Sequence, residues 1–368
     1  MSWTYGMLAH WFASLHPVRL SFSIFIFNYI CNMANLFLEL FRLFRVLNLV
    51  IIALTQIFIR YGIIEPILEK VNVTLRLNNI YFIQPQLLMS HFDFVLLVIS
   101  TVFIAAAGYV INDYFDTKPD RINKPDRLIV GKTIKRRAAM GMHIVLNSIA
   151  VLLAGYLCFK SGKYQLIFIQ LFSIVSLWFY STHFKRQMLV GNIIIAGLAA
   201  LVPLTVVLYE FSFGGLSLVQ LINGVESGAG SRMMMIIALF VMGYAIFAFL
   251  MNMIREIIKD SEDTKGDYQA GMRTLPISVG LRNTRFILMA LIGISVILLG
   301  FVQQMLLDTY KLKVLFYYLL VFVQIPLVYL FFLANNAQQK SDFSKMSLIC
   351  KLIILSGVIS MTVIWATI

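Results

Sequence analysis

The chain has 368 residues, of which 60% are hydrophobic and only 13% are charged, about half the roughly 25% charged residues of soluble domains. This composition excludes a water-soluble fold and is typical of one large membrane domain. The 30 Lys and Arg residues against 17 Asp and Glu give a net charge of +13. Because basic residues in a membrane chain chiefly set its orientation, we expect no nucleic acid partner.

Residues 1–40 are predicted to be an N-terminal extension, and residues 41–368 a single transmembrane domain. The apolar run at residues 20–31 is too short to span a bilayer, and no basic segment of a signal peptide precedes it. Met33 is followed by a run that leads directly into the first predicted span. We therefore hypothesise that translation begins at Met33.

Long apolar stretches bounded by charge predict nine transmembrane helices, since a helix needs about 20 residues to cross the hydrocarbon core. The expected spans are 46–64, 92–111, 138–159, 164–181, 190–211, 233–254, 285–306, 314–334 and 346–366. The fold class is therefore an all-α integral membrane protein.

The basic residues indicate how these spans are oriented. The N-terminal region and the loops after spans 2, 4, 6 and 8 hold 22 of the 30 Lys and Arg residues. The positive-inside rule places that side in the cytoplasm. We expect a multi-pass protein of the cytoplasmic (inner) membrane, with its N-terminus in the cytoplasm.

The acidic residues gather in two loops that repeat one spacing, D-x-x-D-x-x-x-D. The two rows are Asp113, Asp116 and Asp120, after span 2, and Asp260, Asp263 and Asp267, after span 6. On a helix, positions i, i+3 and i+7 share one face, so each row is predicted to present three carboxylates together. Four spans separate the rows, so both emerge on the same side of the membrane and are able to face each other.

Six carboxylates near a low-dielectric boundary resist ionisation unless a cation neutralises them. Oxygen ligands suit Mg²⁺, which takes one or two carboxylates and shares the rest of its shell with water and substrate phosphates. The same loops supply cations that bind phosphate oxygens: Arg121, Lys124, Arg127, Arg255, Lys259, Lys265 and Arg273. The site is therefore predicted to bind a magnesium diphosphate.

The simpler interpretation is that both windows are solvated, salt-bridged loops. The repeated spacing on one side of the membrane argues against it. Asp126 lies outside the spacing and Glu262 lies off its face, so we expect these two to adjust local charge rather than bind metal.

Three segments resemble the motifs of the UbiA superfamily of intramembrane prenyltransferases. Residues 112–127, NDYFDTKPDRINKPDR, are similar to its first aspartate-rich motif, and residues 260–267, DSEDTKGD, followed by GMRTLP at 271–276, to its second. Residues 180–186, YSTHFKR, resemble its Y-S-x-x-x-K stretch. The resemblance extends from about Phe41 to the C-terminus.

The resemblance implies nine helices around a central cavity, capped on the cytoplasmic side by the motif loops. It implies Mg²⁺ ions that bridge an isoprenyl diphosphate, and the predicted metal ligands are Asn112, Asp113, Asp116, Asp120, Asp260, Asp263 and Asp267. Asp116, Asp263 and Lys185 are the expected catalytic residues. The expected substrate contacts are Arg45, Asn48, Arg121, Lys124, Arg127, Tyr180, Lys185, Arg186 and Arg273. For Arg45 and Asn48 the alternative is an interfacial anchor and a helix-packing amide.

The implied reaction moves a prenyl group from an allylic diphosphate, best matched by geranylgeranyl diphosphate, to a lipophilic acceptor. The local sequence around Asn112 and Lys124 is most similar to that of bacterial family members that resemble digeranylgeranylglyceryl-phosphate synthase. The favoured acceptor is therefore geranylgeranylglyceryl phosphate. Arg186, Arg255 and Lys259 are available for its phosphate. The alternative acceptor is aromatic, 4-hydroxybenzoate or a dihydroxynaphthoate of quinone biosynthesis.

Aromatic rings could offer π-faces to the allylic cation. The candidates are Tyr109, Tyr114, Phe115 and Tyr180, although packing is the default role of any single ring in so aromatic a chain.

Two other classes compete with a prenyltransferase. CDP-alcohol phosphotransferases carry a Gly after the second Asp of their motif, whereas Thr117 and Thr264 stand there in this chain. A divalent-cation transporter needs ionisable residues near the middle of the membrane, and the predicted span interiors hold almost none.

Overall fold

The computed structural model describes residues 37–70, 73–77, 79–83, 86–213 and 229–367. The proposed start at Met33 and most of the predicted N-terminal extension lie outside these residues. Within them, nine helical segments are long and apolar enough to cross a membrane, which confirms the predicted number of spans. The predicted division into an extension and one domain stays a prediction.

The first span is composite: helix α3 (Val46–Ile59) continues through one π-helical turn, η1 (Arg60–Ile64), into α4 (Glu65–Lys70). The others are α5 (His91–Phe115), α7 (Arg136–Ser161), η3 (Tyr164–Leu166) with α8 (Ile167–Thr182), α9 (Val190–Glu210), α11 (Ala229–Gln269), α12 (Leu275–Asp308), α13 (Lys313–Leu319) with η5 (Leu320–Gln324) and α14 (Ile325–Asn336), and α15 (Lys340–Thr367).

Several helices are longer than predicted, because hydropathy detects only the apolar part of each. The span expected at 233–254 belongs to α11, which continues to Gln269 and carries the second acidic row beyond the apolar segment. The span expected at 285–306 belongs to α12, which begins at Leu275 and is kinked at Gly280, where φ is 80° and ψ is 157°.

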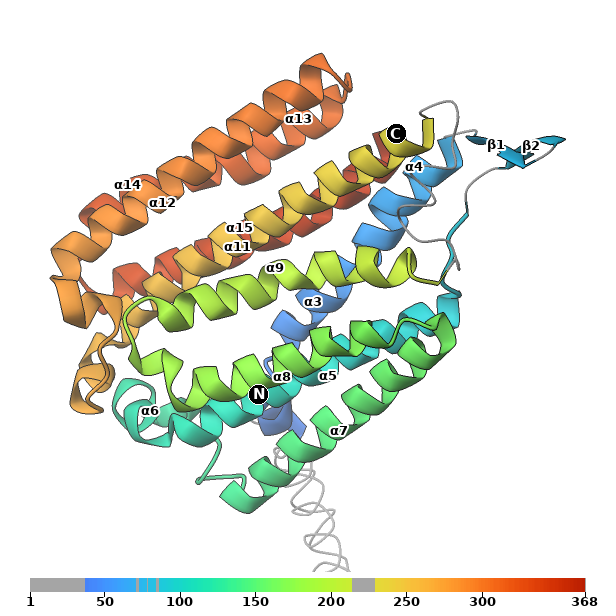
Figure 1. The fold of residues 1–368 in the computed structure, drawn as a ribbon. Helices are drawn as coiled ribbons and strands as arrows, with labels where there is room; N and C mark the ends of the chain where they lie inside the picture. Colours follow the sequence, from blue (N-terminus) through green and yellow to red (C-terminus); the bar gives the residue numbers. More distant parts are fainter. Residues whose placement is uncertain (1–36, 71–72, 78, 84–85, 214–228, 368) are drawn as a thin grey trace, which may run out of the picture.

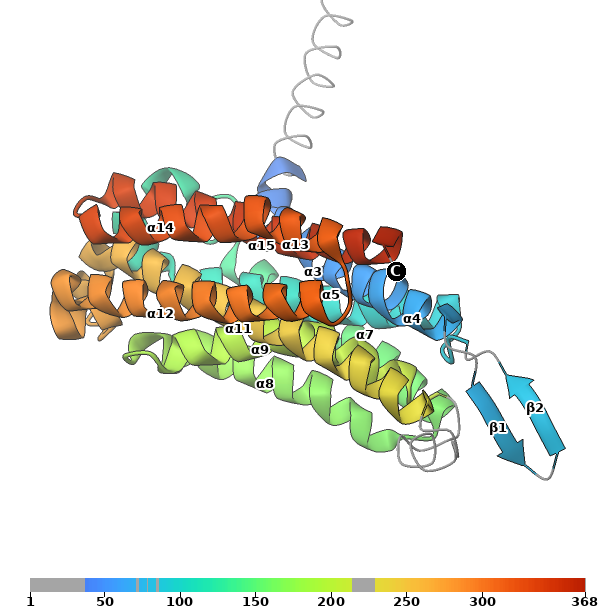
Figure 2. The same ribbon diagram turned by 90° about the horizontal axis from the view of Figure 1, so that it is seen from above.

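Two antiparallel strands depart from an all-α fold. Strand β1 (Val73–Leu77) pairs with β2 (Asn79–Ile83), with Val73 opposite Ile83 and Leu77 opposite Asn79. The hairpin extends beyond α4 at one end of the bundle (Figure 2).

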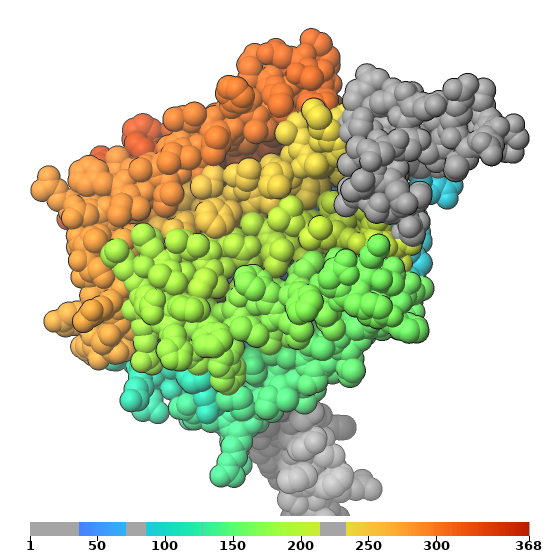
Figure 3. Space-filling view, viewed as in Figure 1, coloured from blue at the N-terminus to red at the C-terminus, as the bar shows by residue number. Residues whose placement is uncertain are grey.

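The long helices run roughly along one direction (Figure 1), with α9 lying between α8 and α11. Helix α5 packs against α7 and α8, whereas α11 packs against α9, α12 and α15. The space-filling view shows the same order as bands, from α12–α14 to α7 and α8 (Figure 3). The two motif regions, at α6 (Thr117–Asn123) and at the α11–α12 connection, lie at the end opposite the hairpin (Figure 1).

The first acidic row is not on one helix, contrary to the prediction. Helix α5 ends at Phe115, Asp116 is its C-cap, and α6 begins at Thr117. Pro119 explains the break, because proline is favoured in the first turn of a helix and disrupts an interior one. The second row does lie on one continuous helix, α11, as predicted.

A buried ion pair at the hairpin end was missed by the sequence analysis. The Arg60 Nε donates to the Glu210 Oε2 at 2.8 Å, and both side chains are almost completely buried. Glu210 Oε1 also accepts from the Leu88 and Met89 backbone N–H groups, at 2.6 and 3.0 Å. The pair joins α9, η1 and the segment that leads into α5.

Candidate active site

A polar cavity of about 1230 Å³ lies at the motif end of the bundle. Its lining includes every residue predicted to bind metal: Asn112, Asp113, Asp116, Asp120, Asp260, Asp263 and Asp267. The two acidic rows, whose corresponding aspartates are 147 residues apart in sequence, therefore border one cavity. The expectation that they face the same space agrees with this geometry.

Asp116 occupies the junction between α5 and α6. Its Oδ2 accepts a hydrogen bond from the Asn112 Nδ2 at 2.7 Å, and the same oxygen is ion-paired with the Lys185 ammonium. Burial opposes the charged form of Lys185, but the Asp116 carboxylate outweighs it, so the pKa of this lysine stands well above its ordinary value. The lysine lies in η4 (Phe184–Arg186), which joins α8 to α9. It therefore brings a fixed positive charge to the first acidic row.

Asp120 lies one turn further, on α6. Burial, reinforced by the nearby Asp116 carboxylate, raises the pKa of Asp120 from 3.8 to about 6. The raised pKa means that the ionised form is costly at this position, and a cation in the cavity would relieve that cost.

The second row is held by polar side chains from two other elements. The Lys124 Nζ donates to the Asp263 Oδ2 at 2.6 Å, and the Asn192 Nδ2, from the first turn of α9, donates to the Asp260 Oδ2 at 2.9 Å. These contacts orient the carboxylates toward the shared cavity.

Asn123 joins the two motifs directly. Its Nδ2 donates to the Asp263 carbonyl oxygen and its Oδ1 accepts from the Gly266 N–H, both at 2.8 Å. A Cβ at Gly266 would lie 2.5 Å from the Asn123 side-chain amide, so only glycine allows this close approach. The end of α6 is therefore fastened to α11.

Arg45, the N-cap residue of α3, has a strained backbone conformation. With φ 51° and ψ 52° it is left-handed, which is uncommon for a residue other than glycine. Its Nη2 donates to the Asp113 Oδ1 at 2.7 Å, and its guanidinium lies 4.9 Å from the centre of the Tyr109 ring. Together with Asn48 it lines the polar cavity, and its role as a substrate contact stays a prediction.

The donor set fits Mg²⁺. Two oxygens, Asn112 Oδ1 and Asp263 Oδ1, are buried without any hydrogen-bond partner. Leaving such an acceptor unsatisfied costs about 1–3 kcal/mol. No three His, Cys, Asp or Glu side chains among the described residues lie close enough to hold a metal ion by themselves. The set is thus of the kind in which a few protein oxygens bind Mg²⁺ and substrate phosphates complete its shell.

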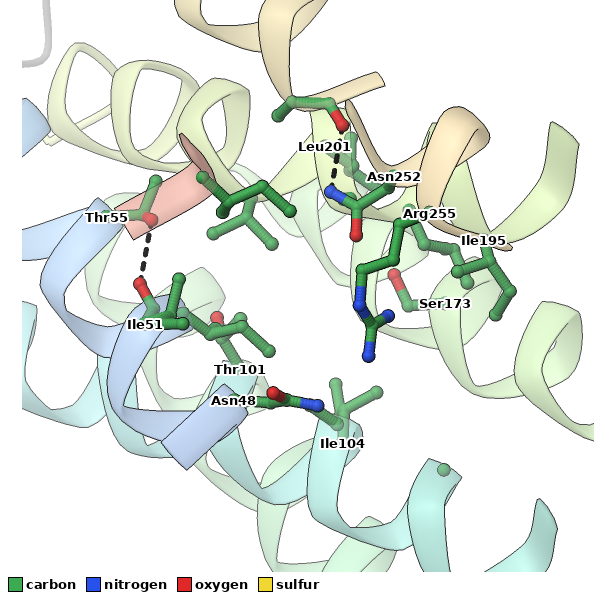
Figure 4. Close-up of a pocket in the computed structure, with 18 of the residues that line it drawn as sticks. Asn48, Ile51, Thr55, Thr101, Ile104, Ser173, Ile195, Leu201, Asn252 and Arg255 are labelled. Carbon is green, nitrogen blue, oxygen red and sulfur yellow. Dashed lines mark hydrogen bonds between the residues drawn. The ribbon is translucent and has the colours of Figure 1, made fainter. Parts of the chain in front are cut away.

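An apolar cavity of about 250 Å³ adjoins the polar one. Its walls come from α3, α5, α8, α9, α11 and α15, with aliphatic side chains such as Ile51, Ile104 and Ile195 (Figure 4). Tyr180 lines both cavities. A polar chamber for a charged headgroup therefore opens onto a hydrocarbon-lined chamber.

Three basic residues predicted to bind substrate do not line either cavity: Arg121, Arg186 and Arg273 are exposed. The local helix phase explains Arg121, because Asp120 and Lys124 share the cavity-facing side of α6 and the residue after Asp120 points about 100° away. The backbone oxygen of Arg186 accepts a hydrogen bond from the Arg273 backbone N–H at 2.9 Å. The prediction for Arg127 falls on a side chain outside the described part of the structure.

The aromatic candidates divide in the same way. Tyr109 and Tyr180 line the apolar cavity. Tyr114 and Phe115 do not: the Arg136 guanidinium lies 4.2 Å from the Tyr114 ring centre, and Phe115 packs edge-on against Trp178. The second pair therefore has a packing role.

Sequence reasoning missed Asn192, Lys345 and Lys351. Asn192 contacts Asp260, and the two lysines, both on α15, line the polar cavity. Asn192 is a polar residue at the start of an apolar span, which was the available signal. For the two lysines of α15, the sequence offered no signal of a site role beyond their charge.

Comparison with known proteins agrees with this geometry. The family model of the UbiA prenyltransferase family matches residues 80–354. The chain belongs to this family. A digeranylgeranylglyceryl phosphate synthase from Methanothermobacter thermautotrophicus is 34% identical over 218 residues, covering 59% of this chain and 66% of that protein. The synthase of the same name from Methanosphaera stadtmanae is 31% identical over 261 residues, covering 70% of this chain and 83% of that protein.

The chain spans just under two thirds of the length of the first of these relatives. Among solved structures, a UbiA homologue from Archaeoglobus fulgidus bound to DMAPP and Mg²⁺ superposes with a TM-score of 0.51 at 18% identity, covering 88% of this chain and 99% of that one. At this identity the similarity establishes the fold alone.

Proposed function

We propose that the protein is a Mg²⁺-dependent prenyltransferase that moves a geranylgeranyl group from its diphosphate to the free hydroxyl of geranylgeranylglyceryl phosphate. One observation carries the proposal: two facing acidic rows border a polar cavity that opens onto an apolar one. This pairing of chambers suits a diphosphate with a long hydrocarbon chain. The acceptor is supported by relatives named digeranylgeranylglyceryl phosphate synthase.

The candidate Mg²⁺ ligands are Asn112, Asp116, Asp120, Asp260, Asp263 and Asp267. When bound, Mg²⁺ would supply positive charge to the diphosphate leaving group. Lys124 and Lys185, each paired with a cavity carboxylate, are placed to donate to diphosphate oxygens as its negative charge grows. Such donors accelerate the reaction to the extent that they bind the transition state more tightly than the ground state.

The apolar cavity protects the reacting carbon. As the allylic C–O bond breaks, the developing cation needs an environment from which water is excluded. The aliphatic walls and the Tyr109 and Tyr180 rings provide that environment. The acceptor hydroxyl oxygen then forms an ether bond to the allylic carbon, diphosphate is the leaving group, and the hydroxyl proton passes to a diphosphate oxygen or to water.

Transport of a divalent cation fits less well. Glu256 is the sole acidic residue among the described residues that line the apolar cavity. The buried pair near the opposite end, Arg60 with Glu210, has its charges mutually neutralised. A path of ionisable groups through the bundle, which transport requires, is therefore not supported.

We also propose that the motif end faces the cytoplasm, from the excess of basic residues in its loops. With nine spans, the C-terminus would then lie on the opposite side. A C-terminal alkaline phosphatase fusion should be active and a C-terminal green fluorescent protein fusion dark; the reverse pattern would refute this orientation.

The function is tested by incubating the purified protein with Mg²⁺ and labelled geranylgeranyl diphosphate, and offering each acceptor separately. Transfer to geranylgeranylglyceryl phosphate, but not to 4-hydroxybenzoate or dihydroxynaphthoate, is the expected result. A prenylated aromatic product would instead move the enzyme to quinone biosynthesis, and the absence of any product would contradict the prenyltransferase assignment.

A further inference from the structure

The boundary between the two cavities carries its own cluster of charge. Five charged side chains line both chambers: Arg45, Arg255, Glu256, Lys259 and Lys351. Four are cationic and one is acidic, whereas the polar cavity beyond them is bordered by both acidic rows. The sign of the charge therefore reverses over a short distance, from acidic rows to a basic boundary.

Arg255, Glu256 and Lys259 form the centre of this boundary. The Arg255 Nη1 donates to the Glu256 Oε1 at 2.9 Å, and the Lys259 Nζ lies 3.5 Å from the Glu256 Oε2. All three occupy the turn of α11 that precedes Asp260. Glu256 thus holds both cations at the mouth of the apolar cavity while neutralising only one of their two charges.

The geometry distinguishes these cations from those that serve the acidic rows. Lys124 is paired with Asp263 and Lys185 with Asp116. Arg255 and Lys259 are ion-paired with Glu256, which belongs to neither row. Figure 4 shows the Arg255 guanidinium projecting into the cavity on the side of Asn48. A guanidinium has five N–H donors, so the single bond to Glu256 leaves donors for a ligand.

We propose that Arg255 and Lys259 form a second anion subsite, which binds the phosphate monoester of the acceptor. The inference rests on the proposed function and specifies how its acceptor is recognised. A phosphate monoester carries about −1.5 to −2 charges near neutral pH. An arginine fork and a lysine point charge are complementary to such a group. Bound there, the headgroup lies where the polar and the apolar chambers meet, so the neighbouring glyceryl hydroxyl is presented to the prenyl carbon.

The subsite predicts that two changes are equivalent: removing the cations from the protein, or removing the phosphate from the acceptor. We would therefore measure kcat/KM for geranylgeranylglyceryl phosphate and for its dephosphorylated alcohol, using the wild type, Arg255→Gln and Lys259→Gln. Arg282→Gln is the matched control, because Arg282 is an exposed arginine at the start of α12 that lines neither cavity. Binding of geranylgeranyl diphosphate with Mg²⁺ is measured on every variant, and size-exclusion chromatography in detergent verifies folding independently.

Each of the two substitutions should lower kcat/KM for the phosphorylated acceptor about 10- to 100-fold, as expected for a lost bond between charged groups. The value for the alcohol, the affinity for the diphosphate and the control variant should each change less than about threefold, within the spread of a surface substitution. Lys259→Arg, which keeps the charge, should recover most of the loss.

Two results would overturn the subsite while leaving the proposed function intact: an equal loss with both acceptors, or a weakened affinity for the diphosphate. The second would assign these cations to the donor. Failure of the proposed function itself is recognised separately, because the wild type would then transfer nothing to the glyceryl phosphate, and the subsite would be refuted with it.

Discussion

The buried ion pair at the hairpin end gives the sharpest prediction about stability. Arg60 and Glu210 are each almost completely shielded from solvent. The Arg60 guanidinium also donates to the Tyr61 hydroxyl at 3.0 Å and to the Met89 carbonyl oxygen. Replacing Glu210 by Gln removes the negative charge but keeps an acceptor for the Leu88 and Met89 N–H groups. The buried guanidinium then loses its counter-charge, and its Nε–H faces the donor amide nitrogen of Gln instead of the Glu210 Oε2 acceptor.

Breaking a buried pair from one side costs about 3–5 kcal/mol. We therefore expect Glu210→Gln to lower the free energy of unfolding by about that amount, measured by SDS titration in mixed micelles. Arg42→Gln is the control, since Arg42 pairs with Glu39 while its side chain is 67% exposed, and exposed pairs contribute at most about 1 kcal/mol.

The double variant Arg60→Gln/Glu210→Gln separates charge from packing. It removes both charges, so it should be less destabilised than the sum of the two single variants, with a coupling of at least about 1 kcal/mol. The reasoning is refuted if Glu210→Gln costs no more than Arg42→Gln, or if the two single effects simply add.

Three further predictions concern the site. Gly266→Ala should abolish most activity while the protein stays folded, because the new Cβ meets the Asn123 amide that joins α6 to α11. The control Gly141→Ala should keep wild-type turnover, because the space around Gly141 is open. Asn192→Ala should raise the Mg²⁺ concentration for half-maximal activity about tenfold, as loss of an orienting partner does. The control Asn283→Ala, at an exposed residue, should leave that concentration unchanged. An unchanged Mg²⁺ dependence in Asn192→Ala would contradict the role of its bond to Asp260. Chelation by EDTA should stop turnover, and added Mg²⁺ should restore it; turnover that persists in EDTA would refute the metal requirement.

The number of spans and the second acidic row could be predicted because both depend on local pattern. Hydropathy alone determines where apolar helices lie, and Asp260, Asp263 and Asp267 keep their helical phase because α11 runs unbroken past them. The first row shows the limit of that approach. Its spacing is the same, but α5 ends before Asp116, and Pro119 was the signal that a new helix begins.

Contacts between distant residues could not be predicted in this way. Arg60 and Glu210 are 150 positions apart, and nothing in their separate surroundings indicates that they meet. The basic residues near the motifs were likewise indistinguishable by composition. Lys124 reaches Asp263, whereas Arg121, three positions earlier, is exposed, because α6 turns one toward the cavity and the other away.

The central claim is that the two acidic rows together bind a magnesium prenyl diphosphate. The most direct test is calorimetric titration of geranylgeranyl diphosphate, with and without Mg²⁺, into the wild type, Asp116→Ala, Asp263→Ala and Glu262→Ala. We expect Mg²⁺-dependent binding that is lost in both aspartate variants and largely kept in Glu262→Ala, whose side chain lines the same polar cavity but lies outside the repeated spacing. Full Mg²⁺-dependent binding by either Asp116→Ala or Asp263→Ala would contradict the claim.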